Sequence, residues 1–126
     1  MTTRVDAGRV VVFPVSAALL DAAVVEQEVA DPELSAYCTF IGTVRDSNHG
    51  KPTTYLFYSA YTVMAERELA RIGAEAVERW PKARVGLAHR SGRLSGFQPP
   101  SSWHGCYLCR PLLWLDRRKR PTRVRR

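Results

Sequence analysis

The chain has few of the features that mark secreted or membrane-bound proteins. Its three cysteines are too few for a disulfide framework, and no apolar run approaches the roughly 20 residues that a membrane-spanning helix needs. The first residues also lack the charged and then apolar pattern of a secretory signal. We therefore expect a soluble cytoplasmic protein.

Acidic residues are scarce in the later part of the chain. No Asp or Glu lies between Glu78 and Asp116, and residues 110–126 hold eight basic side chains and one acidic side chain. This segment carries the whole formal charge of +7, so residues 1–109 are neutral overall. Like charges gathered in one tail predict no basic face on the rest of the protein, and hence no specific nucleic-acid site.

What the sequence does contain is enough for one folded domain. With 126 residues, 45% of them apolar, the chain can bury a core without disulfides or metals. Patterns of apolar, β-branched and aromatic residues predict strands at 10–13, 36–45, 53–58 and 85–89, and helices at 16–31 and 62–80. This order predicts an α+β fold, with helices packed on a largely antiparallel sheet.

Details of these elements are also predicted. Ser16 is expected to cap the first helix, and Pro81 to end the second. The apolar stripe of the first helix is Leu19, Leu20, Ala23 and Val24, and that of the second is Ala65, Leu69, Ile72, Ala76 and Trp80.

A turn at 46–52 should pair the strands on either side of it, and 91–96 should form another turn. The nearby aromatic residues, expected in core or interface packing, are Tyr55, Phe57, Tyr58 and Tyr61.

Three segments, taken in order, resemble the large catalytic subunit of molybdopterin synthase. They are Thr39 to Asp46 followed by Asn48, then Tyr58 to Leu69, and then Arg79-Trp80-Pro81 through Arg84-Val85 to the run from His89 to Leu94. Each segment alone is weak, but their order and spacing are specific. The resemblance covers residues 8 to 97, which divides the chain into an incomplete family domain at 1–97 and a divergent basic tail at 98–126.

The resemblance implies a place in molybdenum cofactor biosynthesis. Members of this family convert a cyclic pyranopterin monophosphate to molybdopterin, with sulfur from the thiocarboxylated tail of a small ubiquitin-like partner. Two large subunits form a central dimer, and one small subunit docks on each outer side. The implied fold is an α/β hammerhead with an additional antiparallel sheet, and no metal or other cofactor is expected in the protein.

By the same resemblance, Thr43, Val44 and Arg45 line the pterin pocket. The substrate and the sulfur donor are both anionic, and sulfur addition develops further negative charge, so the pocket needs a cation in partly dry surroundings. A guanidinium at a strand end, beside a turn that offers backbone N–H groups, can bind a phosphate with two hydrogen bonds. The ordinary alternative is a surface arginine paired with Asp46 or another neighbour.

The His89-Arg90 pair is explained more simply by structure than by chemistry. A histidine that ends a strand is more often structural than catalytic, and the arginine after it is more often in solvent. The family's pattern also treats this pair as part of the fold and expects a later His-Arg pair at the pterin.

The sequence departs from the family after Leu94. The family continues with an apolar strand, the later His-Arg pair, an amphipathic helix and two lysines expected to act in sulfur transfer. Here the sequence has no helical or strand period from Gln98 onward, and the only lysine after Lys82 is Lys119. This departure predicts an impaired enzyme or, as an alternative, a non-catalytic member that still binds its partners.

A change of reading frame near Gln98 would explain the departure. Reading the last base of each codon with the first two of the next turns Trp103-His104 into Ala, and Ser102-Trp103 into Val, Leu or Met. With TCN serine codons, the shifted frame gives a small residue followed by an apolar run, which is the strand that the family has there. We therefore hypothesise that residues 98–126 are an out-of-frame tail.

A different function is suggested by Cys106 and Cys109, which form a Cys-x-x-Cys pair after His104 and before the basic tail. Such residues occur in zinc sites, and the tail would bind polyanions. A structural zinc needs four ligands, however, and the remaining cysteine, Cys38, lies in a predicted strand. We therefore favour the enzyme family over a zinc or nucleic-acid-binding module.

Overall fold

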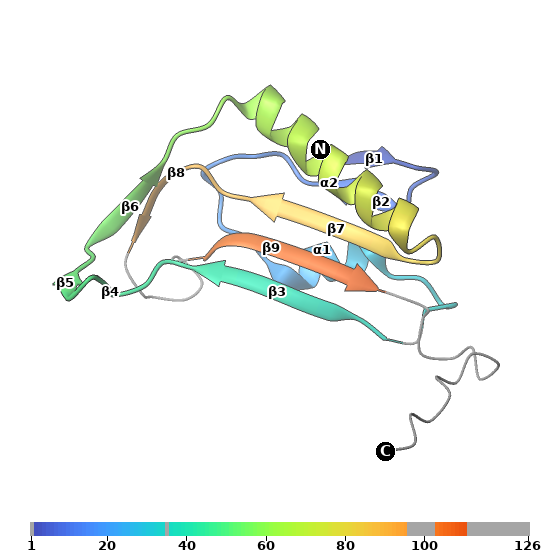
Figure 1. Ribbon diagram of the computed structural model, residues 1–126, viewed down its shortest axis with the longest axis horizontal. Coiled ribbons are helices and arrows are strands. Elements are labelled where there is room, and N and C mark those ends of the chain that lie inside the picture. Colours follow the sequence, from blue (N-terminus) through green and yellow to red (C-terminus); the bar gives the residue numbers. More distant parts are fainter. Residues whose placement is uncertain (1, 35, 96–102, 111–126) are drawn as a thin grey trace, which may run out of the picture.

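The computed structural model describes residues 2–34, 36–95 and 103–110, the last segment by its backbone. At its centre is a five-stranded sheet in the order β1 (Thr3–Val5), β2 (Val10–Val12), β7 (Arg84–His89), β9 (Trp103–Arg110) and β3 (Cys38–Thr43) (Figure 1). β2 and β7 run parallel, and the other neighbours run antiparallel. We call this sheet and its two helices the body.

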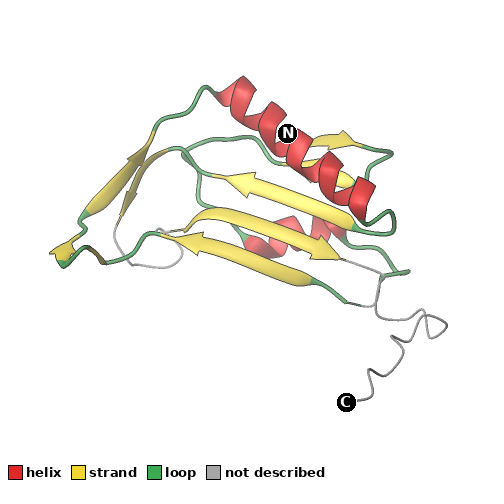
Figure 2. Ribbon diagram, in the orientation of Figure 1, coloured by secondary structure: helices red, strands yellow, loops and turns green. Residues whose placement is uncertain are grey.

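The helices cover opposite faces of the sheet (Figure 2). α2 (Thr62–Arg79) packs on β2 and β7 from one side, and α1 (Ala22–Val29) packs on β7 and β9 from the other. Two helices over mixed and antiparallel sheets confirm the predicted α+β class.

The core is built on the alternation of side chains along β2. Val10 and Val12 join the cluster under α2, whereas Val11 joins the cluster under α1. All three valines are at most 2% exposed. A strand covered on both faces is apolar at every position, which is why this short run is all valine.

Gly73 lets α2 approach β2 closely. A Cβ at this position would lie 2.3 Å from Cγ1 of Val10. The helix predicted at 62–80 is confirmed, but its buried residues are Leu69, Gly73 and Val77. The predicted stripe was therefore partly wrong, since Ile72 and Trp80 are 43% and 40% exposed. Because Gly73 lies at the centre of the face that α2 presents to the sheet, the large residues Ile72 and Trp80 lie at the edge of that face.

The N-cap of the first helix lies five residues later than expected. Asp21 caps it, with Oδ1 accepting a hydrogen bond from the backbone N–H of Ala23 at 2.9 Å. The predicted cap, Ser16, instead accepts from the N–H of Ala18 at 3.3 Å and stabilises a turn. Because the chain before Asp21 is a loop, the predicted stripe is also wrong, and Val25 and Val29 are the buried residues of α1.

A two-stranded sheet projects from one end of the body (Figures 1 and 2). It consists of β6 (Tyr55–Tyr58) and β8 (Gly92–Ser95), which pair antiparallel, and we call it the wing. A hairpin of β4 (Ser47–Asn48) and β5 (Lys51–Pro52) leads into it. Two predictions are corrected here. β6 pairs with β8 and not with β3, and the turn expected at 91–96 contains β8.

β9 lies between β7 and β3, in the interior of the main sheet. Its residue Cys106 is in register with Ile41 on one side and Ala88 on the other. We expected no strand after Gln98, and this is wrong for residues 103–110. They lack an alternation of polar and apolar residues, but their backbone pairs with a strand on each side. The division of the chain at residue 97 and the change of frame stay predictions, and the tail at 111–126 lies outside the described residues.

Candidate functional site

The predicted pocket residues lie where β3 leaves the body for the hairpin. Thr43 ends β3 and is half-buried, Val44 is 1% exposed, and Arg45 is exposed. The buried Val44 side chain fixes this stretch of backbone to the protein interior. Arg45 therefore projects from an anchored segment, although it lies just outside regular structure.

Two hollows adjoin the Arg45 side chain. One, of about 100 Å³, is lined by Val44, Arg45, Ser47, Asn48, Thr53 and Leu56. The other, more open and of about 450 Å³, is lined by Thr43, Arg45, Asp46 and Ser47. The structure thus brings all three predicted residues to one place, and Arg45 is shared by both hollows.

The guanidinium of Arg45 is held by a neutral side chain. Nη2 donates a hydrogen bond to Oδ1 of Asn48 at 2.9 Å. Among the described residues no carboxylate forms an ion pair with Arg45, so its partner is not Asp46 but another neighbour, Asn48, as the ordinary alternative also allowed. The guanidinium is thus held by an amide oxygen and not by an ion pair.

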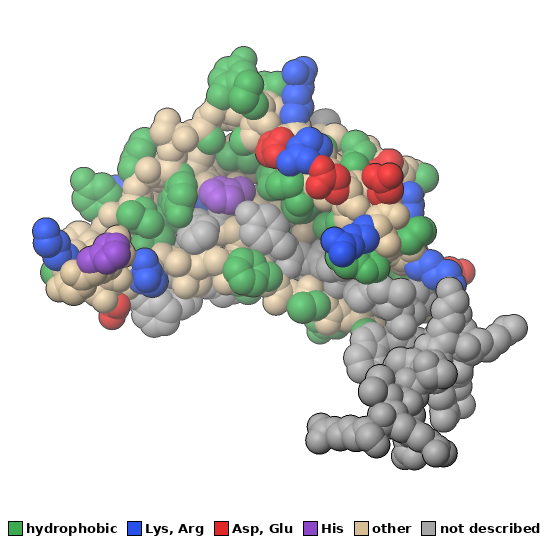
Figure 3. Space-filling model, in the orientation of Figure 1, with side chains coloured by type: hydrophobic (Ala, Val, Ile, Leu, Met, Phe, Trp, Pro, Cys, Tyr) green, Lys and Arg blue, Asp and Glu red, His purple; other side chains and the backbone are tan. Residues whose placement is uncertain are grey.

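The hairpin turn sets the position of Asn48. His49 and Gly50 have φ angles of 49° and 75°, so both central residues are in the left-handed region that tight two-residue turns require. Below the turn, the backbone N–H of Thr53 donates to the carbonyl oxygen of Asp46 at 2.6 Å. The turn predicted at 46–52 is confirmed, and on the visible face basic side chains and a histidine gather at this end of the molecule (Figure 3).

His89 and Arg90 connect the body to its surroundings. The His89 ring meets Tyr58 of the wing edge-on, with centroids 5.4 Å apart, and its Nδ1 lies 2.6 Å from the carbonyl oxygen of Arg90. Arg90, which we expected in solvent, is 6% exposed, and its Nη2 donates to the carbonyl oxygen of Ala17 at 3.2 Å. These contacts join the end of β7 to the wing and to the loop before α1.

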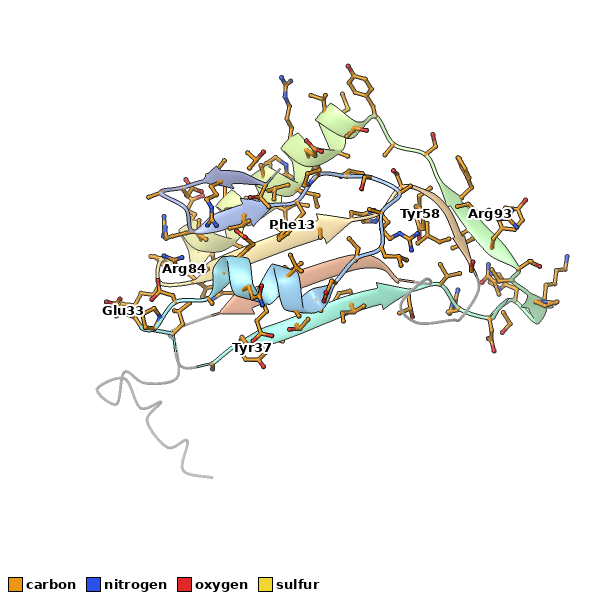
Figure 4. All side chains as sticks on the ribbon, turned by 180° about the vertical axis from the view of Figure 1, so that it is seen from behind. Phe13, Glu33, Tyr37, Tyr58, Arg84 and Arg93 are labelled. Carbon is orange, nitrogen blue, oxygen red and sulfur yellow. The ribbon has the colours of Figure 1, made fainter. Side chains whose placement is uncertain are left out.

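The wing and the loop after it carry four aromatic residues, Tyr55, Phe57, Tyr58 and Tyr61, and three of these are exposed. Tyr55, Phe57 and Tyr61 are 51%, 68% and 74% exposed, so core packing was the wrong expectation for them. Tyr58 lies on the side of the wing that faces the body, and Arg93 lies on β8 (Figure 4), where its guanidinium covers the Tyr55 ring at 4.3 Å. The wing therefore presents an apolar surface with little covering.

Metal and membrane features can be assessed for the described part of the chain. Within it, no three His, Cys, Asp or Glu residues are grouped as a metal would require. The same part contains no helix of the length and apolarity that would cross a bilayer. The side chains of His104, Cys106 and Cys109 lie outside the described residues, although their backbone belongs to β9.

Comparison with known proteins places these features in a family. A family model described as MoaE protein matches residues 15–98, which include the hairpin, the wing and all three pocket residues. The chain belongs to the MoaE family. The resemblance inferred from the three sequence segments is thereby confirmed, and the match stops before β9.

Relatives of known name agree with this family. The molybdopterin synthase catalytic subunit of Halalkalibacterium halodurans is 52% identical over 81 residues, which cover 61% of this chain and 52% of that protein. The chain thus spans about half the length of the curated relatives it matches.

Solved structures of the family share the fold. Molybdopterin synthase from Staphylococcus aureus superposes with a TM-score of 0.73 at 29% identity, covering 79% of this chain and 70% of that one. A complex of subunits 1 and 2 of molybdopterin-converting factor from Helicobacter pylori gives a TM-score of 0.58 at 15% identity, over 82% of this chain and 65% of that one. At this low identity, the likeness shows that the two share a fold and nothing more.

One site residue was missed by reasoning from the sequence. Asn48 was noted as part of the family motif and of the turn, but not as the hydrogen-bond partner of Arg45 that it is. The available signal was the Arg-x-x-Asn spacing at the start of a tight turn.

Proposed function

We propose that this chain is the large subunit of molybdopterin synthase and works in the cytoplasm in molybdenum cofactor biosynthesis. Its substrate is a cyclic pyranopterin monophosphate, and its sulfur donor is the thiocarboxylated tail of a small ubiquitin-like subunit. The observation that carries the proposal is Arg45, an exposed cation without a carboxylate partner, between two hollows in the segment matched by the family.

The chemistry of the reaction fits this arrangement. Sulfur transfer forms a carbon–sulfur bond on the pterin precursor and breaks the acyl–sulfur bond of the donor, on which oxygen from water then restores a carboxylate. Precursor phosphate, donor and intermediates are all anionic, so a fixed cation lowers the energy of each of them. Arg45 binds the phosphate, while Thr43 and the buried Val44 form the polar and apolar walls beside it.

Two partners belong to the proposal. A second copy of the chain forms the central dimer, supported by the exposed aromatic side chains of the wing, because aromatic residues are enriched at protein interfaces. The small subunit docks on each outer side. Turnover is impaired in this chain, since the two lysines that the family uses after Leu94 have no counterpart in the sequence.

Binding of the pterin precursor tests the site. Replacing the guanidinium (Arg45→Ala) should weaken binding of cyclic pyranopterin monophosphate by about tenfold or more, because hydrogen bonds to charged groups are the strong ones. Lys82→Ala is the matched control, since it removes one positive charge from an exposed position after α2. Unchanged affinity in the Arg45 variant would refute the site.

Molybdopterin formation tests the activity. The full chain, mixed with a thiocarboxylated small subunit and the precursor, should bind both and form molybdopterin far more slowly than the synthase of Staphylococcus aureus under the same conditions. A rate equal to that enzyme would contradict the proposed impairment. Failure to bind the precursor or the small subunit would contradict the proposed function.

A further inference from the structure

We propose that Asn48 is a positioning residue, which holds the Arg45 guanidinium at the pocket and leaves its full charge available to the phosphate. This inference rests on the proposed function of Arg45 and adds a second residue to the site. Its basis is the 2.9 Å hydrogen bond from Nη2 of Arg45 to the amide oxygen of Asn48. Both residues line the smaller hollow, so the bond lies beside the space that the anion would occupy.

The backbone around Asn48 is held on both sides. Asn48 is in register with Lys51 across a turn of two residues, and Ser47 is in register with Pro52. The hydrogen bond between Thr53 and Asp46 closes the base of the hairpin. An acceptor fixed in this way restrains a long arginine side chain before the ligand arrives, so less conformational freedom is lost on binding.

The other arginines of the molecule show why the neutral acceptor matters. Where Arg4, Arg71 and Arg84 bind a side-chain acceptor, that acceptor is a carboxylate: Glu28, Glu68 with Glu75, and Asp31 respectively. Arg45 has an amide in this role, although Asp46 is its direct neighbour in the sequence. A carboxylate would restrain the guanidinium equally well but would cancel the charge that attracts an anion.

Two substitutions separate restraint from charge. Asn48→Ala removes the acceptor and keeps the charge of Arg45, so the affinity for cyclic pyranopterin monophosphate should fall by about 3- to 10-fold, as expected for one hydrogen bond. Asn48→Asp keeps an acceptor of nearly the same shape and adds a negative charge, so the affinity should fall by at least as much. Thermal unfolding of both variants should match that of the original chain.

The outcomes distinguish this inference from the proposed function. If Arg45→Ala binds the precursor normally, or if the original chain does not bind it, the proposed function and the positioning role of Asn48 are both contradicted. If Arg45→Ala loses binding while Asn48→Ala stays within twofold of the original, the positioning role alone is overturned. Normal binding by Asn48→Asp would also overturn it, because a purely structural asparagine tolerates this change whereas a site that needs uncompensated charge does not.

Discussion

The body and the wing of this molecule are both built from β-strands, yet they bury their residues very differently. In the body, β2 is fully buried, and four of the six residues of β7 are buried. The structure describes all eight residues of the wing, and among them Leu94 alone is buried. The body therefore supplies the stability, and the wing supplies exposed surface.

The candidate site lies at the junction of the two regions. A ribbon of two four-residue strands is at best marginally stable in water by itself, so the wing depends on its attachment to the body. The attachment includes the edge-on contact of Tyr58 with His89. The predicted pocket residues lie at this junction, where Val44 is buried and Arg45 is exposed.

The largest effect is expected from Leu94→Ala, at the buried position of the wing. Leu94 is completely buried, and the replacement of a buried leucine by alanine costs about 2–5 kcal/mol. Urea denaturation followed by circular dichroism measures the change. Leu19→Ala, at a position that is 60% exposed, is the matched control and should change the free energy of unfolding by less than about 0.5 kcal/mol. Equal losses in the two variants would contradict the assigned burial.

A somewhat smaller effect is expected in the body from Gly73→Ala. In an exposed helix this change normally stabilises, but here the added Cβ would collide with Cγ1 of Val10. We expect a loss of about 1–3 kcal/mol in the free energy of unfolding. Glu78→Ala, at an exposed position of α2, controls for helix propensity. A more stable Gly73 variant would show that α2 lies farther from β2 than described.

In the wing, loss of an exposed aromatic ring should change association and leave stability intact. Phe57 is 68% exposed in the single chain and belongs to the proposed dimer surface. Phe57→Ser should weaken self-association by about tenfold or more, as measured by sedimentation equilibrium, while the unfolding free energy changes by less than about 0.5 kcal/mol. Met64→Ser tests a second exposed apolar position, at the start of α2. A dimer that is unaffected by both would place the interface elsewhere.

The smallest effect concerns charges on the solvent side of α2. A hydrogen bond from Arg71 holds the pKa of the Glu68 carboxyl below its ordinary value. The stabilisation from this pair is therefore present above the ordinary carboxyl pKa and is lost as the pH falls through the lowered pKa. Glu68→Gln should be slightly less stable than the original chain at neutral pH, and the difference should disappear in acid. Urea denaturation at neutral and at acid pH measures this difference.

The comparison also explains which parts of the fold could be predicted. The helix over 62–79 and the strands at 10–12 and 84–89 have apolar patterns set by burial in the body, and these were found. The buried face of α2 was misjudged because Gly73 packs closely without being counted as apolar. Ser16 was taken for a helix cap because the same hydroxyl chemistry also stabilises a turn.

Pairing between strands was harder to predict than the strands themselves. β3 and β6 are separated by a turn and were expected to pair, but β3 pairs with β9, whose residues lie 60 or more positions farther along the chain. Arg45 was expected at the pocket from the family resemblance, and its role there stays a prediction. Its partner Asn48 was missed, since a turn residue gives no sign in the sequence of which side chain it will face.

The place of β9 in the sheet has a consequence for folding. Within the described residues β3 pairs with β9 alone, and β7 is joined to β3 only through β9. As the chain leaves the ribosome, β3 emerges early and must wait for residues 103–110 before its backbone groups find partners. Contact order is therefore high, which slows folding and leaves an unpaired edge open to other nascent chains. Chaperone dependence during synthesis should be sensitive to changes in this last strand.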